Sequence, residues 1–104
     1  MADEPARPDN CQTMEEVRAG VDATDAQLLG LLARRFAYMR AAARIKPDRG
    51  TVRDEERKAN VIANAVNRAQ ELGLPAATVA DIWDRLVEGS IAYEFEEWDR
   101  LRDG

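Results

Sequence analysis

Two cations at helical spacing are the most informative residues for chemistry in this sequence. Arg35 interrupts an otherwise apolar stripe, and Lys46 follows it by eleven residues, close to three helical turns. On one helix both side chains would point the same way, roughly 16 Å apart along the axis. Two long side chains leaning towards each other leave room for one small dianion, and an arginine fork holds a carboxylate bidentately.

A purely structural explanation of Arg35 stays open at this point. A buried guanidinium needs an anion close by. That anion can be a carboxylate of the protein core, or only the apolar stem is buried while the charged head reaches water. The spacing alone does not choose between these alternatives and a ligand carboxylate.

Arg18 is a third candidate cation, but it lies too far from Arg35 to share a pocket within one helix. It precedes Arg35 by seventeen residues, which is about 25 Å along a helix and roughly 100° around it. In an antiparallel dimer, the Arg18 end of a partner helix would reach the pocket instead.

The composition limits the classes of function. The chain has 104 residues, a net charge of −5 and a sequence pI of about 4.8, which argues against nucleic acid as a partner. It has no histidine, the commonest metal ligand and general base. Its single cysteine, Cys11, excludes an intrachain disulfide and fits a reducing compartment. No stretch resembles a membrane span or a signal peptide, so we expect a cytoplasmic protein without membrane partners.

Three helices must position the cations. Thr13 and Glu16 form a capping-box pattern that starts a helix over residues 14–45, and Lys46-Pro47 ends it. A second helix begins between Thr51 and Asp54 and ends before Gly73 and Pro75, and a third runs from about residue 76 to 100. We expect a flexible arm over residues 1–12, a helical domain over 13–100 and a frayed tail over 101–104.

The first helix carries the apolar stripe at spacings of three and four. Its members are Met14, Val17, Val21, Thr24, Leu28, Leu31, Arg35, Tyr38, Ala42 and Ile45. A helix of this length measures about 48 Å, too long to be covered by two further helices of one chain. The sequence therefore predicts an all-α fold, with long, medium and long helices in an intertwined homodimer.

These residues resemble the all-helical AroQ class of chorismate mutases, which includes the related isochorismate-pyruvate lyase. The resemblance spans residues 11–98, and its motifs combine in the same order and frame. They are Val17-Arg18-x-x-Val21-Asp22-x-x-Asp25, Leu32-x-Arg34-Arg35, Lys46, Val52-Arg53-Asp54-x-x-Arg57 and Ser90-Ile91.

The resemblance implies a homodimer with two shared sites and a role for each matching residue. Arg35 would bind one substrate carboxylate, and Arg18 of the other chain would bind the second. Lys46 would donate to the substrate ether oxygen and to a carboxylate.

On the second and third helices, Asp54 would lie near the ring hydroxyl, Arg57 would hold a carboxylate and Ser90 would line the pocket. The chain departs from the family pattern at two further substrate positions. Lys58 replaces a frequent glutamate, and Glu94 replaces the glutamine that faces the ether oxygen. A protonated Glu94 would donate to that oxygen, whereas an ionised one would repel it. The plain alternative is a solvated Glu94 in an acidic run with Glu96 and Glu97.

The expected activity is the Claisen rearrangement of chorismate to prephenate, a step towards aromatic amino acids. This intramolecular reaction needs no metal, cofactor or nucleophile, only a held conformer and fixed charges. The alternatives are cleavage of isochorismate to salicylate and pyruvate, rearrangement of an amino-substituted chorismate, and a non-catalytic helical dimerisation module.

Overall fold

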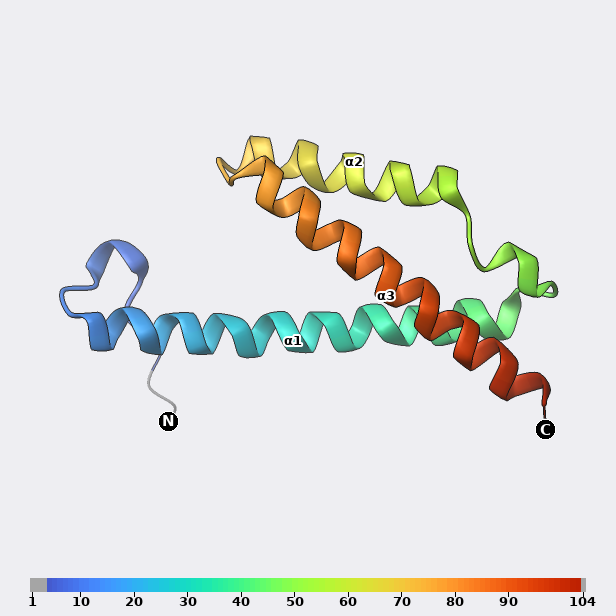
Figure 1. Ribbon diagram of the computed structural model, residues 1–104. Helices are drawn as coiled ribbons and strands as arrows, with labels where there is room; N and C mark the ends of the chain where they lie inside the picture. The colour runs from blue at the N-terminus through green and yellow to red at the C-terminus, as the bar shows by residue number, and fades with distance from the viewer. Residues whose placement is uncertain (1–3, 104) are drawn as a thin grey trace. The chain divides into compact units, whose positions relative to one another are not determined.

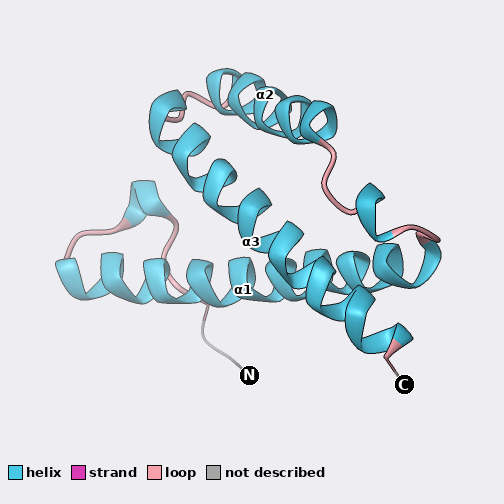
Figure 2. Cartoon of the chain, turned by 45° about the vertical axis from the view of Figure 1, so that its right-hand side comes forward, coloured by secondary structure: helices cyan, strands magenta, loops and turns pink. Residues whose placement is uncertain are grey.

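The fold is helical in the computed structural model, which describes residues 4–103 (Figures 1 and 2). The long helices are α1 (Met14–Ile45), α2 (Glu55–Glu71) and α3 (Ala76–Arg102), and no strand occurs among the described residues. Short 3₁₀ turns, η1 (Pro8–Asn10) and η2 (Arg49–Thr51), precede α1 and α2. The all-α prediction with long, medium and long helices is confirmed. The chain divides into two compact units, residues 1–36 and 37–104, and α1 contributes to both.

The first unit begins α1 with the predicted capping box. The backbone N–H of Glu16 donates to Thr13 Oγ1 at 3.1 Å, and the Glu16 carboxylate accepts from the Gln12 N–H at 3.1 Å. The Thr13 hydroxyl also donates to that carboxylate at 3.3 Å. The Thr13 hydroxyl thus pairs the Glu16 N–H, one of the backbone donors that a helix start leaves unpaired, and the Glu16 carboxylate reaches back to the residue before the cap.

The predicted arm at residues 1–12 contains the turn η1, while its residues 1–3 lie outside the described part of the chain. On α1, which follows the arm in sequence, several residues of the predicted apolar stripe are exposed in the single chain. Their exposed fractions run from 37% to 64% at Met14, Val17, Val21, Leu28 and Leu31. Within the first unit, these side chains therefore form an exposed apolar face.

The second unit is organised around a hairpin of α2 and α3. Its buried cluster consists of Val52, Val87 and Ile91, against which Val61, Phe95 and Trp98 pack. The turn η2 is tied to α3 by two bonds from Arg49 to the Asp99 carboxylate, at 2.8 and 3.1 Å, and by the Arg49 guanidinium over the Phe95 ring. The loop before α2 is thus held on the side of α3 that carries Phe95 and Ile91.

The connection between α2 and α3 is a Schellman turn centred on Gly73. The Leu74 N–H donates to the Ala69 carbonyl at 2.8 Å, and the Gly73 N–H donates to the Gln70 carbonyl at 3.2 Å. Gly73 has a φ of 71°, a conformation that side chains with a Cβ adopt at a cost. The glycine therefore sets the sharp reversal that brings α3 back along α2.

The C-terminal boundary differs from the prediction. Helix α3 continues through Leu101 to Arg102, two residues beyond the expected end at residue 100, and Gly104 lies outside the described residues. No helix in the range 4–103 is long and apolar enough to cross a membrane.

Replacing Gly73 should destabilise the hairpin. In Gly73→Ala an alanine must adopt the left-handed backbone conformation, so we expect the free energy of unfolding to fall by about 1 kcal/mol. Urea unfolding measures this change. Gly50→Ala is the matched control, because Gly50 has open space around it and no positive φ. An equal loss of stability in both variants would contradict the role assigned to the Gly73 turn.

Candidate active site

The most buried ion pair of the second unit joins Lys46 to Glu94. Lys46 directly follows the last residue of α1, and Glu94 lies on the inner face of α3. The Lys46 Nζ is 2.8 Å from Glu94 Oε2, with the lysine side chain 31% exposed and the glutamate side chain 5% exposed. Glu94 is therefore buried, and the alternative of a solvated residue in an acidic run is wrong.

The Glu94 carboxylate has limited compensation for its burial. Its Oε2 accepts no well-directed hydrogen bond among the described residues, although the Lys46 ammonium is at ion-pair distance. Coulomb attraction between the two charges dominates at this distance, because it depends little on direction. An ammonium has three donors, and the Lys46 side chain is a third exposed, so Lys46 can face a further anion while it stays beside Glu94.

Ser90 lies one helical turn before Glu94 on the same face of α3. It is 3% exposed, and its hydroxyl donates to the Leu86 carbonyl at 2.7 Å. The predicted site residues Ser90, Glu94 and Lys46 thus belong to one buried region of the second unit.

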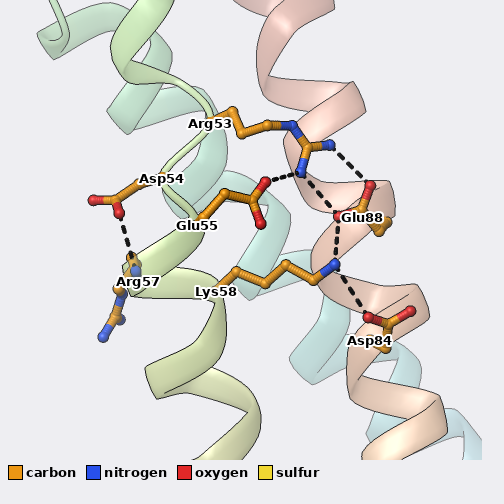
Figure 3. Close-up of polar contacts among 7 residues, drawn as sticks. All are labelled: Arg53, Asp54, Glu55, Arg57, Lys58, Asp84 and Glu88. Atoms are coloured by element: carbon orange, nitrogen blue, oxygen red, sulfur yellow. Dashed lines mark hydrogen bonds and ion pairs between the residues drawn. The ribbon is translucent and has the colours of Figure 1, made fainter.

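Asp54 and Arg57 lie at the start of α2. Asp54 is the N-cap, and its Oδ1 accepts the Arg57 N–H at 3.0 Å. Both residues are exposed, and their side chains lie on the side of α2 away from the ion pairs with α3 (Figure 3). The cap fixes the Asp54 carboxylate, while the Arg57 guanidinium extends into solvent.

Lys58 points in the other direction, into an ion-pair network with α3 (Figure 3). Its Nζ is 2.8 Å from Glu88 Oε2 and 3.1 Å from Asp84 Oδ1. Glu88 also accepts two bonds from Arg53, at 3.1 and 2.8 Å. Two carboxylates of its own chain thus hold the ammonium of Lys58, and its role in substrate binding stays a prediction.

Glu88 is the centre of this network, and the pKa of its carboxyl is lowered by the surrounding cations. Hydrogen bonds from Arg53 and then Lys58 lower the pKa of the Glu88 carboxyl from 4.5 to about 2. The same contacts raise the pKa of the Lys58 ammonium and of the Arg53 guanidinium. All these groups are therefore charged at neutral pH and attach the start of α2 to α3.

The remaining predicted cations, Arg18 and Arg35, belong to the first unit. Both lie on α1, where Arg18 is exposed and Arg35 is half-buried. Their proposed placement around a ligand therefore rests on helix spacing and on the family motifs.

Two residues that the sequence did not single out contact Lys46. The indole Nε1 of Trp98 and the Nη2 of Arg102 donate to the Lys46 carbonyl at 3.0 and 2.8 Å. Both follow Glu94 at steps of four residues, the spacing of one helix face. That spacing is the available signal, but the sequence alone predicts only a helix that ends near residue 100 and a frayed tail.

The Glu88 network predicts a specific acid sensitivity. Because the pKa of Glu88 is lowered on folding, the folded state binds fewer protons than the unfolded state between about pH 4.5 and pH 2. Stability from this group is present above pH 4.5 and is lost as pH falls towards 2. Glu88→Gln should unfold more easily at neutral pH and lose stability less steeply in that window.

Urea midpoints at a series of pH values measure this dependence. Glu96→Gln, which removes an exposed carboxylate of α3 outside the network, is the control. An identical pH slope in Glu88→Gln and the wild type would contradict the assignment.

Comparisons with known proteins agree with the resemblance seen in the motifs. The family model described as chorismate mutase type II matches residues 17–95, which include every predicted site residue from Arg18 to Glu94. A protein of Pseudomonas aeruginosa named isochorismate pyruvate lyase is 27% identical over 95 residues, covering 91% of this chain and 94% of that protein. The match over most of the chain shows that it belongs to the chorismate mutase type II family.

Proposed function

We propose that this protein is an enzyme that rearranges chorismate to prephenate. The observation that carries the proposal is the Lys46–Glu94 pair, in which the ammonium of a partly exposed lysine lies 2.8 Å from a buried carboxylate. The motif resemblance assigns these two residues to the positions that face the breaking ether bond, and both lie within residues 17–95, which match chorismate mutase type II.

The reaction places few demands on the protein. The Claisen rearrangement breaks the ether C–O bond and forms a C–C bond within one molecule, without a nucleophile or proton donor as reactant. The site must hold the substrate in its diaxial conformer and stabilise negative charge that develops on the ether oxygen. Lys46 supplies the donor for that oxygen, and Arg35 holds a substrate carboxylate.

Glu94 has two functions in this proposal. Its burial beside Lys46 fixes the direction of the ammonium. When it carries a proton, its carboxyl also donates to the ether oxygen, as an amide would at the same position. An ionised Glu94 only orients Lys46, so turnover should be faster for the protonated enzyme.

We further propose a homodimer in which each site uses Arg18 of the other chain. The support is the exposed apolar face of α1, where Val21, Leu28 and Leu31 are more than half exposed. Apolar faces of this kind on a soluble protein mark contact surfaces. Arg18 lies on the same helix, about 25 Å from Arg35 along the axis, so it can serve the pocket only from a second copy. Asp54, Arg57 and Ser90 complete the proposed contacts with the ring and a carboxylate.

The second candidate is cleavage of isochorismate to salicylate and pyruvate. It is favoured by the Pseudomonas aeruginosa relative, which is named for this activity and aligns over nearly its full length. Isochorismate carries the same two carboxylates, and its cleavage also proceeds without a cofactor through a plausible pericyclic transition state. The same cations would serve both reactions.

A paired assay of the purified protein tests the proposal. Chorismate and isochorismate are supplied separately, and prephenate and salicylate are followed with time. We expect a higher kcat/KM for chorismate. A higher kcat/KM for isochorismate would transfer the assignment to the lyase. If a folded protein forms neither product, the assignment becomes a non-catalytic module.

The shared site predicts complementation between inactive subunits. Arg35→Ala should lose most activity because it removes a carboxylate contact, and Arg18→Ala should do the same. A mixed dimer contains one site with both arginines intact and one site with neither. Subunit exchange followed by the activity assay should therefore recover part of the turnover, up to about half per mixed dimer. Exchange without any recovery, verified by mass spectrometry, would contradict the shared site.

The proton on Glu94 predicts a pH profile. Wild-type kcat should rise as pH falls, because the protonated carboxyl donates to the ether oxygen. In Glu94→Gln the amide donates at every pH, so the profile should become flat. Steady-state kinetics across the stable pH range measure both curves. Parallel curves for the two proteins would remove Glu94 from the reaction.

A further inference from the structure

One face of α3 contacts the end of α1 at three successive turns. Glu94, Trp98 and Arg102 are spaced four residues apart, so they lie above one another on the helix. Each contacts Lys46: Glu94 contacts the ammonium, and Trp98 and Arg102 contact the backbone carbonyl. We refer to these three residues as the α3 clamp.

The clamp binds several carbonyls at the end of α1. Arg102 Nη1 donates to the Ala43 carbonyl at 2.9 Å, and its Nη2 donates to the carbonyls of Arg44 at 3.5 Å and Lys46 at 2.8 Å. The Arg102 guanidinium also stacks on the Trp98 ring, 4.2 Å from its centre. Trp98 thus supports Arg102 and adds its own bond to the Lys46 carbonyl.

The sequence after Lys46 explains why the helix needs these donors. The last carbonyls of a helix lack partners within it and are often satisfied by N–H groups of the following residues. Here the next residue is Pro47, which has no N–H. Side chains of α3 take over, and the positive guanidinium also suits the negative end of the α1 dipole.

We propose that Trp98 and Arg102 are positioning residues for Lys46, whose ammonium is proposed to contact the substrate. They fix the backbone from which the Lys46 side chain starts, while Glu94 fixes its charged end. Neither residue is assigned a contact with substrate, and both lie outside the segment that matches the family model. As a role in catalysis, the inference rests on the proposed function.

The position of the ammonium can be measured without any activity, because the chain contains only two lysines, Lys46 and Lys58. Side-chain NMR of lysine-labelled protein reports both, and Lys46→Arg assigns the signals. Arg102→Ala removes the carbonyl bonds, and Trp98→Phe removes only the indole N–H while keeping a ring. We expect both variants to shift the Lys46 signal and to leave Lys58, in its own network, unchanged.

Arg100→Ala is the matched control. Arg100 is exposed on the same last turns of α3, and it forms an ion pair with Glu97 on the same helix. This variant should leave both lysine signals and the activity at wild-type values. Unchanged Lys46 signals in folded Arg102→Ala and Trp98→Phe would overturn the proposal.

A double-mutant cycle separates positioning from simple stabilisation of the fold. Arg102→Ala should lower kcat/KM by roughly ten- to a hundredfold, because small displacements of a catalytic group have effects of this size. In a Lys46→Ala background the same change should have less than about a twofold effect, because no ammonium remains to be positioned. Equal losses in both backgrounds, measured on folded protein, would assign Arg102 a structural role only.

The two proposals fail in different ways. A wild type that converts neither chorismate nor isochorismate refutes the proposed function, while the lysine signals still decide whether the clamp positions Lys46. If the wild type is active but the Lys46 signal is unchanged in both Arg102→Ala and Trp98→Phe, only the proposal for the α3 clamp is refuted.

Discussion

The Lys46 ammonium and the buried Glu94 carboxylate form the interaction on which the second unit depends. A carboxylate removed from water is unfavourable by several kcal/mol unless a cation compensates for the loss of hydration. Removing Lys46 would leave Glu94 unpaired in the interior, and removing Glu94 would release the ammonium. The end of α1 and the middle of α3 are therefore linked by charge as well as by packing.

The other contacts of α3 serve this pair by fixing the chain on either side of it. Arg102 and Trp98 hold the carbonyl of Lys46, and Arg49 ties the following turn to Asp99 and Phe95. The start of α2 is attached separately, through the Glu88 network. A site that works by fixed charges needs this rigidity, because its donors must already point correctly when the reaction begins.

Local signals in the sequence were sufficient for the three helices and for their ends, except that α3 continues to Arg102. The capping box at Thr13, the proline after Lys46 and the glycine at position 73 each act within a few residues, so they could be recognised without the fold. The family motifs likewise marked Lys46 and Glu94. Burial of Glu94 could not be decided in this way, because its neighbours Glu96 and Glu97 suggested a solvated acidic surface.

Contacts between distant segments were the part that sequence could not provide. Arg102 was assigned to a fraying tail because charged residues near a chain end are usually exposed. Its guanidinium is held by carbonyls more than fifty residues earlier, a pairing that no local pattern encodes. Lys58 was placed in the substrate site by position, whereas its contacts are with Glu88 and Asp84 across the hairpin.

The two lysines allow a direct test of where the substrate binds. The measurement is an NMR titration of lysine-labelled protein with an unreactive bicyclic ether dicarboxylate that copies the rearrangement transition state. The account predicts that the Lys46 signal shifts with saturation, and the Lys58 signal tests the predicted contact of that residue with substrate. A saturable shift of Lys58 alone, or no shift of Lys46 at any ligand concentration, would contradict a site centred on the Lys46–Glu94 pair.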